Sequence, residues 1–219
     1  MPQPRLYTGQ KGAIAMPNIV RETADGTRFI SIEDELMRRR TIFLTETVTR
    51  ESAVELVKQL MFLESEEPGK EITLVINSPG GSVNDGLAVY DYIRLMSSPV
   101  RTVCVSGAES MGAILFLAGD KRELLPHSRI MIHDPHYSGS GATYEGKKPN
   151  EIEEDLENLR KISKVLCEII AERTGKPLKS VQAKTRQDSY FSAEEAVEFG
   201  LATGIITSVG GEDNEGRVI

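Results

Sequence analysis

Two hydrophobic periods alternate along the chain. Apolar, β-branched runs at 72–76, 100–105 and 129–132 have the length of buried strands. Apolar residues at helical spacing occupy three further segments, at 50–65, 83–96 and 111–118. Strands that alternate with helices in this way predict an α/β fold, in which repeated βα units build a parallel sheet with right-handed crossovers.

The segments around this repeat carry their own signals. Residues 19–30 predict a hairpin, because the Asp25-Gly26 pair tolerates the positive φ of a tight turn. Residues 31–40 predict a short helix and 41–44 a strand. A long helix is predicted from about 149 to 173, with apolar residues at helical spacing, carboxylates in the first turns and Thr174-Gly175 as the stop.

The length and composition are those of one domain. At 219 residues, the chain stays below the size at which single cores tend to split. We expect a mobile amino-terminal segment at 1–18, one folded domain at 19–208, and a disordered tail at 209–219 that has too little apolar content to pack.

Charge and cysteine usage exclude several classes of protein. The 33 acidic and 26 basic residues give a net charge of −7, and no basic run contains interleaved aromatics, so a nucleic-acid partner is not expected. The sequence shows no targeting segment and no apolar stretch of about 18 residues, so we expect no membrane-spanning helix. Cys104 and Cys167 lie in apolar segments and are expected to be buried free thiols with no bound metal, as suits the cytoplasm.

A serine and a histidine form the candidate chemistry. Ser110 stands between the apolar run 100–105 and the helical pattern 111–118, where a strand-to-helix junction exposes a nucleophile beside unpaired helix amides. His133 ends the apolar run 129–132, which is a suitable place for a general base. Either residue alone is more often structural, as a cap or a satisfied core group.

A glycine pair strengthens this interpretation. The strand at 72–76 breaks into Asn77-Ser-Pro-Gly80-Gly81, and adjacent glycines allow a backbone amide to approach a ligand closely. The pattern is also that of an ordinary strand-to-helix turn. The functional alternative is an oxyanion hole built from the amides of Gly81 and Met111.

Ordered motifs over about 19–207 resemble those of the proteolytic subunits of the Clp protease, ClpP, which are serine peptidases of the crotonase-like superfamily. The motifs are Asp25-Gly-Thr-Arg-Phe, Thr41-Ile-Phe-Leu, Met61-Phe-Leu-Glu-Ser, Ile76-Asn-Ser-Pro-Gly-Gly, Glu109-Ser-Met-Gly-Ala, Met131-Ile-His and Phe191-Ser-Ala-Glu-Glu-Ala-Val-Glu-Phe-Gly-Leu. The resemblance implies Ser110 as nucleophile, His133 as base, and the amides of Gly81 and Met111 as the oxyanion hole.

The resemblance also implies an assembly. The hairpin at 19–30 would form an axial pore loop, and the glycine-rich stretch 138–143 with the long helix would form a protruding strand-plus-helix handle that interlocks two heptameric rings. From the pattern alone, that helix could equally pack on the core. An AAA+ unfoldase, which uses the ATP, would feed unfolded polypeptide into the chamber, and this chain would need no cofactor. Val75 and Thr73 stand where tyrosines often line the docking pocket for that partner, so this pocket is expected to differ.

One position departs from the family pattern. The acid of the triad is expected one residue before Thr185, where this chain has Lys184, whose charged ammonium offers no acceptor to His133. Three alternatives remain open: Asp188 reaches the site from the same face of a helix, a neutral Lys184 acts in a Ser-Lys arrangement, or a carbonyl or water holds the base.

This departure leaves more than one function open. The first is a self-compartmentalised serine endopeptidase, and the second is a catalytically impaired structural subunit of a mixed ring. A crotonase-type acyl-CoA enzyme would share the fold and the glycine-built oxyanion hole, but Ser110 with His133 favours peptide acyl transfer.

Overall fold

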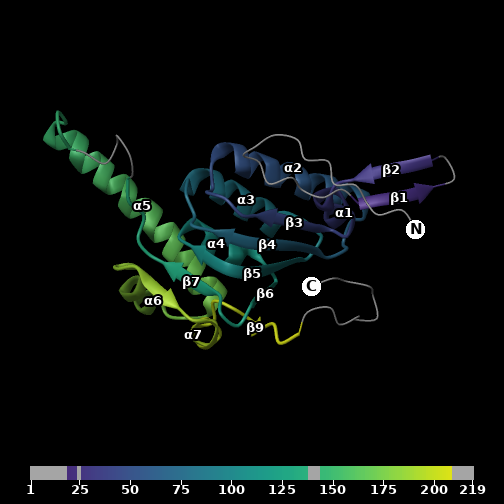
Figure 1. Cartoon of the computed structure of the whole chain (residues 1–219). Helices are drawn as coiled ribbons and strands as arrows, with labels where there is room; N and C mark the ends of the chain where they lie inside the picture. Colours follow the sequence, from purple (N-terminus) through teal and green to yellow (C-terminus); the bar gives the residue numbers. More distant parts are fainter. Residues whose placement is uncertain (1–18, 24–25, 138–143, 209–219) are drawn as a thin grey trace, which may run out of the picture.

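A mostly parallel sheet forms the centre of the computed structural model, which describes residues 19–23, 26–137 and 144–208 (Figure 1). Its main path runs β3-β4-β5-β6-β9, while β7 pairs with β5 and then with β8. Only the β7–β8 pair among these is antiparallel. The strands are β3 (Thr41–Leu44), β4 (Ile72–Ser78), β5 (Val100–Glu109), β6 (Lys121–Leu124), β7 (Arg129–Ile132), β8 (Ser189–Phe191) and β9 (Gly204–Ile205).

Helices enclose this sheet. Figure 1 shows α2 and α3 stacked along one side, with α6 and α7 at the opposite end of the molecule. Together with α4, the helices α2 and α3 supply much of the buried apolar core. The helices are α1 (Ile32–Arg38), α2 (Arg50–Glu66), α3 (Val83–Leu95), α4 (Met111–Ala118), α5 (Pro149–Thr174), α6 (Leu178–Thr185) and α7 (Ala193–Phe199). Among the described residues, no helix is long and apolar enough to cross a membrane.

Most of the elements expected from the sequence are confirmed. The hairpin is formed by β1 (Ile19–Thr23) and β2 (Gly26–Ile30), paired antiparallel from Ile19 with Ile30 to Thr23 with Gly26. Strand β5 continues beyond the expected end at Val105 as far as Glu109. The expectations for 1–18, 138–143 and 209–219 lie outside the described residues.

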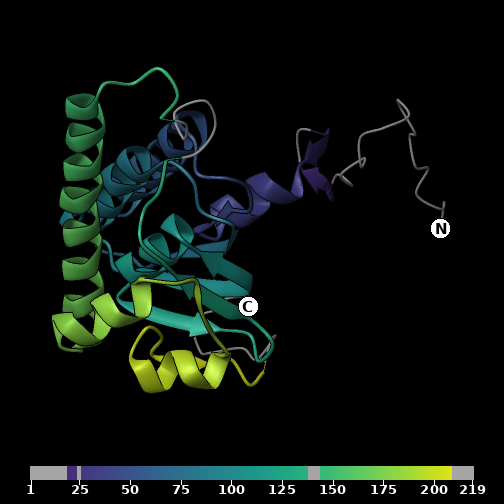
Figure 2. The ribbon, with the colours of Figure 1, turned by 90° about the vertical axis from the view of Figure 1, so that its left-hand side faces the viewer.

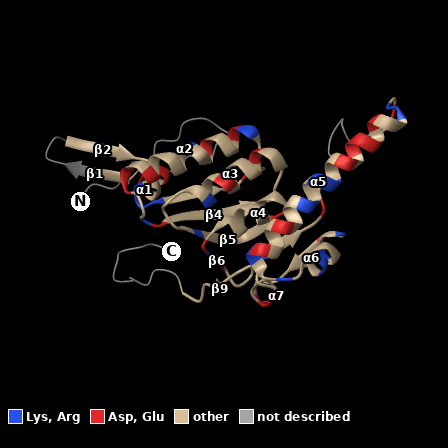
Figure 3. Cartoon of the chain, turned by 180° about the vertical axis from the view of Figure 1, so that it is seen from behind, with Lys and Arg blue, Asp and Glu red and all other residues tan. Residues whose placement is uncertain are grey.

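Helix α5 stands at one edge of the molecule and extends well past the sheet (Figures 1 and 2). Its 26 residues give it a length of about 39 Å. The buried residues are confined to its second half, at Leu166, Cys167 and Ile170, while Leu156 in the first half is 40% exposed. Acidic and basic residues are interspersed along it (Figure 3). The helix therefore packs on the core over its carboxyl-terminal half and protrudes over the rest.

Helix α4 is buried along its whole length. A buried helix leaves its last carbonyls without water, so they need other donors. Arg173 at the end of α5 donates to the carbonyls of Leu117 and Gly119, at 2.8 and 2.7 Å, and Arg94 of α3 donates to the carbonyl of Ala118 at 3.2 Å. These cations also oppose the negative end of the helix dipole.

Arg122 of β6 completes this cap. Its guanidinium is buried and donates to four carbonyls, those of Gly119, Arg173, Gly200 and Leu201. Burial, together with the neighbouring guanidinium groups of Arg173 and Arg94, lowers the pKa of Arg122. The side chain therefore joins α4, α5 and the segment after α7 in one polar cluster.

Replacing Arg122 tests this cluster. The Arg122→Leu substitution leaves several buried carbonyls without donors, at a cost of about 1–3 kcal/mol each, so we expect the free energy of unfolding to fall by at least about 3 kcal/mol. Urea denaturation would measure the loss. The control is Arg38→Leu, which removes an ion pair to Glu35 from a side chain that is 64% exposed and should change stability by less than about 1 kcal/mol. An equal loss of stability for the two substitutions would contradict the role of Arg122 as a donor to buried carbonyls.

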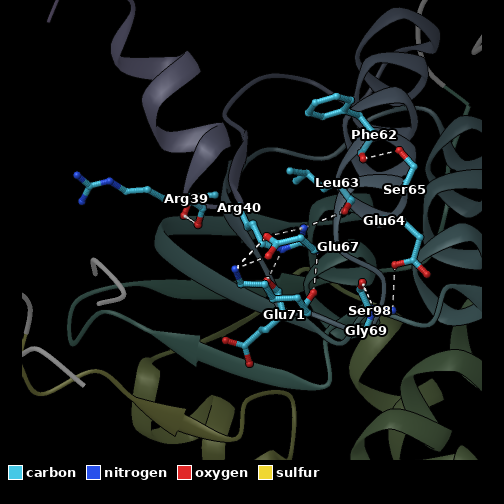
Figure 4. Close-up of polar contacts among 12 residues, drawn as sticks. Arg39, Arg40, Phe62, Leu63, Glu64, Ser65, Glu67, Gly69, Glu71 and Ser98 are labelled. Atoms are coloured by element: carbon cyan, nitrogen blue, oxygen red, sulfur yellow. Dashed lines mark hydrogen bonds and ion pairs between the residues drawn. The ribbon is translucent and has the colours of Figure 1, made fainter. Parts of the chain in front are cut away.

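A second polar cluster closes the end of the sheet where β3 and β4 begin (Figure 4). Arg40 has a positive φ of 60° and donates to the carbonyls of Leu63, Lys70 and Glu71. Nearby, Glu64 of α2 accepts hydrogen bonds from Ser97 and Ser98. These bonds join the end of α2 to the turn between α3 and β5.

The Glu64 contact predicts a pH dependence of stability. Hydrogen bonds from Ser97 and Ser98 lower the pKa of Glu64 to about 2, whereas an unfolded glutamate titrates near about 4.3. The stabilisation is therefore complete above about pH 4.5 and is lost as the pH falls towards about 2. We expect the difference in melting temperature between wild type and Glu64→Gln to shrink over that window. Glu55→Gln, on the exposed face of α2, is the control, and a pH-independent difference for Glu64→Gln would contradict the prediction.

Candidate active site

Ser110 lies between the end of β5 and the start of α4, as the sequence predicts. Its backbone has φ 53° and ψ −121°, a conformation that non-glycine residues rarely adopt and that is common at functional sites. Its amide donates to the carbonyl of Met131 at 2.9 Å, which continues the pairing between β5 and β7 by one residue. The strained turn places the hydroxyl within reach of His133.

His133 follows β7 and reaches the serine. Its Nε2 lies 2.8 Å from the Oγ of Ser110. The imidazole is largely covered, with 15% of the side chain exposed, and its ring meets that of His136 edge-on at 5.3 Å between centroids. The two residues singled out from separate segments of the sequence are therefore in direct contact.

Asp188 occupies the other side of the histidine. Its Oδ1 lies 3.0 Å from the Nδ1 of His133, and 60% of its side chain is exposed. Of the three open alternatives, the structure contains the Asp188 contact. It does not arise from a shared helix face, because α6 ends at Thr185 and Asp188 lies directly before β8.

Lys184 is directed to a different surface. Its Nζ lies 5.6 Å from the centroid of the Phe191 ring, in a hollow that Lys176, Glu195 and Phe199 also line. A cation above an aromatic face is stabilised by the ring quadrupole. This environment gives the ammonium no desolvated position beside Ser110 and does not support a Ser-Lys arrangement.

The glycine loop adjoins the serine. A Cβ on Gly80 would lie 2.7 Å from the amide nitrogen of Met111 and 2.8 Å from the Cβ of Ser110, so only glycine allows this approach. Gly81 has φ 148°, and a Cβ there would lie 2.2 Å from the carbonyl oxygen of Val48. The Met111 amide belongs to the first turn of α4, where amides have no partner within the helix. Gly80 therefore packs against the first turn of α4, and the pairing of the Gly81 and Met111 amides in an oxyanion hole stays a prediction.

An apolar pocket opens beside Ser110 and His133. Helices α3, α4 and α5 and the strand β7 contribute its walls. The apolar lining residues are Val83, Met111, Ile114, Ile132, Pro135, Leu166 and Ile170. The space that this lining encloses is small, about 20 Å³, so its apolar walls lie close to Ser110 and His133.

The cysteines stand apart from this chemistry. Cys104 and Cys167 are both free and buried, as expected from the sequence, and burial raises the pKa of Cys104 to about 11. In the part of the chain that the structure describes, no group of three or more His, Cys, Asp or Glu residues could hold a metal ion.

Sequence reasoning named Ser110 and His133 but gave Asp188 only as one alternative, on a different argument. The signal that could have placed Asp188 was the short alternation of polar and apolar residues at 189–191, which predicts a strand directly after it. A strand of three residues gives too weak a pattern to reveal an antiparallel register.

Comparison with known proteins shows which family contains this fold and this pairing of a serine with a histidine. A profile of the Clp protease family matches residues 24–209. The chain belongs to the Clp protease family. It is 42% identical over 193 residues to the ATP-dependent Clp protease proteolytic subunit 2 of Parasynechococcus marenigrum (strain WH8102), a match that covers 87% of this chain and 95% of that protein. This membership and the named relative support a serine-type peptidase with the α/β fold described above.

Proposed function

We propose that this Clp protease family member is a serine endopeptidase that uses Ser110 as nucleophile and His133 as general base. The observation that carries the proposal is the 2.8 Å contact between Ser110 Oγ and His133 Nε2. The hydroxyl oxygen attacks the scissile carbonyl carbon while its proton passes to Nε2, and the same proton then goes to the leaving amine. Water, deprotonated by His133, hydrolyses the acyl-serine and regenerates the hydroxyl.

The amides of Gly81 and Met111 would receive the oxyanion of the tetrahedral intermediate. Backbone donors that are aimed before the reaction need no rearrangement when the charge develops, and such donors are worth about 10²- to 10³-fold each in turnover. An apolar side chain on the acyl side of the scissile bond would pack against the apolar lining beside Ser110. No cofactor takes part in this scheme.

The protruding half of α5 supports an assembly. The printed name of the relative is that of the proteolytic subunit of an ATP-dependent protease. By that likeness, this chain would form heptameric rings, stacked as a tetradecamer or mixed with a second subunit type, and would receive unfolded polypeptide from an AAA+ unfoldase in the cytoplasm. Leu156, on the part of the helix that extends beyond its own core, is a large apolar side chain that is 40% exposed and could contact a neighbouring subunit.

The contact between Asp188 and His133 favours an active peptidase over an impaired structural subunit. A carboxylate within hydrogen-bond distance of Nδ1 can hold the neutral tautomer that leaves Nε2 free to accept a proton. An acyl-CoA enzyme of the same fold would have no need of a serine hydroxyl bonded to an imidazole.

A fluorophosphonate probe tests the nucleophile. We expect stoichiometric labelling of the assembled wild-type protein and hydrolysis of a fluorogenic peptide that has leucine before the scissile bond. Ser110→Ala should abolish both, because it removes the only hydroxyl in contact with Nε2 among the described residues. Ser106→Ala, on the same strand, is the matched control and should keep both activities. A wild-type protein that neither reacts with the probe nor cleaves the peptide would contradict the peptidase proposal and favour the structural subunit.

Substitutions on α5 test the assembly. We expect Leu156→Glu to shift the protein from rings or double rings to smaller species in analytical ultracentrifugation without loss of helical content. Leu166 is buried within the subunit and lines the pocket, so Leu166→Glu should destabilise the fold itself by several kcal/mol. A wild-type protein that stays monomeric at micromolar concentration would contradict the assembly.

A further inference from the structure

We propose that His136, in the segment that leads from β7 towards α5, is a positioning residue whose ring packs on the His133 imidazole and keeps it aimed at Ser110. This inference deepens the proposed peptidase function and rests on it. The centroids of the two rings lie 5.3 Å apart, and the ring planes meet at 73°. Aromatic rings favour this edge-to-face arrangement at such a distance.

The backbone after β7 makes this contact possible. In a regular strand, residues three positions apart point to opposite faces of the sheet, so their side chains do not meet. Strand β7 ends at Ile132, and residues 133–137 belong to no helix or strand. Pro135, between the two histidines, has a fixed φ and restricts Asp134 before it to an extended backbone. The irregular course of this segment allows the two imidazoles to meet.

The segment that carries His136 is anchored to α5 on both sides of this residue. Before it, the carboxylate of Asp134 accepts a hydrogen bond from the hydroxyl of Ser163 at 3.0 Å. After it, the hydroxyl of Tyr137 lies 3.4 Å from the carbonyl oxygen of Asp155. These contacts hold the backbone of His136 in a defined place, although its side chain is exposed.

The base depends on the orientation of its ring. Nε2 of His133 lies 2.8 Å from Ser110 Oγ while Nδ1 lies 3.0 Å from Asp188 Oδ1, and a rotation of the ring would break both contacts. The Asp188 side chain is 60% exposed, so it is enclosed on only part of its surface. A second ring packed on the imidazole restricts this rotation without occupying either nitrogen, and precise orientation is what a general base contributes to turnover.

Three roles of His136 make different predictions. If the ring acts by packing, any flat ring of similar size serves equally well. If the residue acts by its charge, another cation serves and an uncharged ring does not. If it contacts the substrate, its loss changes KM and leaves kcat unaltered. The packing role is the one that the edge-on contact supports.

The test compares His136→Phe, His136→Ala and His136→Lys in the assembled particle. The first keeps a flat ring, the second removes the ring, and the third keeps only a positive charge. We expect His136→Phe to stay within about twofold of the wild-type kcat, whereas His136→Ala and His136→Lys lower kcat by about 3- to 10-fold, which is what one aromatic pair is worth. KM for the fluorogenic peptide should change by less than about twofold, and fluorophosphonate labelling should slow in parallel with kcat.

His127→Ala is the matched control. His127 is an exposed histidine between β6 and β7, and its loss should leave kcat, KM and the labelling rate unchanged. The melting temperature and the sedimentation of all these variants should equal those of wild type, because both histidine side chains lie at the surface of the subunit.

Several results would overturn the inference. One is a His136→Ala variant that keeps the wild-type kcat. A second is activity that His136→Lys retains and His136→Phe loses, because this marks a role of charge. A third is a change in KM alone, which marks a substrate contact, and a fourth is a loss of kcat accompanied by altered assembly or a lower melting temperature, which marks a structural role. In each case wild-type labelling at Ser110 would leave the peptidase proposal standing, whereas a wild-type protein that does not react with the probe would remove both.

Discussion

The complete burial of α4 is the constraint on which the rest of the structure depends. A helix without water must have its carboxyl-terminal carbonyls satisfied by protein, and here guanidinium groups from α3, β6 and α5 do so. Those three arginines bring distant segments of the chain to one end of α4. At the other end, the strained Ser110 begins the helix, and the Met111 amide that follows it has no acceptor within the helix. Helix α4 thus lies at the centre of the core and also places the nucleophile at the positive end of its dipole.

Different kinds of contact close the two ends of the sheet. Where β3 and β4 begin, Arg40 and Glu64 are bonded to backbone and hydroxyl groups, and these bonds join helices to strands. Where β5 and β7 end, the chain leaves the sheet at Ser110 and His133, and the glycine loop after β4 packs against Ser110. Parallel strands place their carboxyl ends on the same edge, so residues that follow different strands meet there.

Much of this arrangement can be predicted from the sequence, and the exceptions have physical causes. The βα repeat, the hairpin and the contact between Ser110 and His133 follow from strong apolar periods and from the position of each residue at the end of a run. Strands β6, β8 and β9 are short and mix polar with apolar residues, so their pairing comes from tertiary contacts. The sequence offers Asp188 only as one of three alternatives for the same reason: its place is set by a register with β7, and the spacing of four from Lys184 suggests a helix face that does not exist there.

Helix α5 connects the active site to the protruding surface of the subunit. Its buried half supplies Leu166 and Ile170 to the pocket beside Ser110, and its last turn supplies Arg173 to the cap of α4. Cys167, between them, contacts the Thr185 hydroxyl in the loop before Asp188. The exposed half continues the same hydrogen-bonded rod beyond the core (Figure 2). One continuous helix thus links the surface proposed for assembly to the pocket wall, the end of α4 and the loop before Asp188.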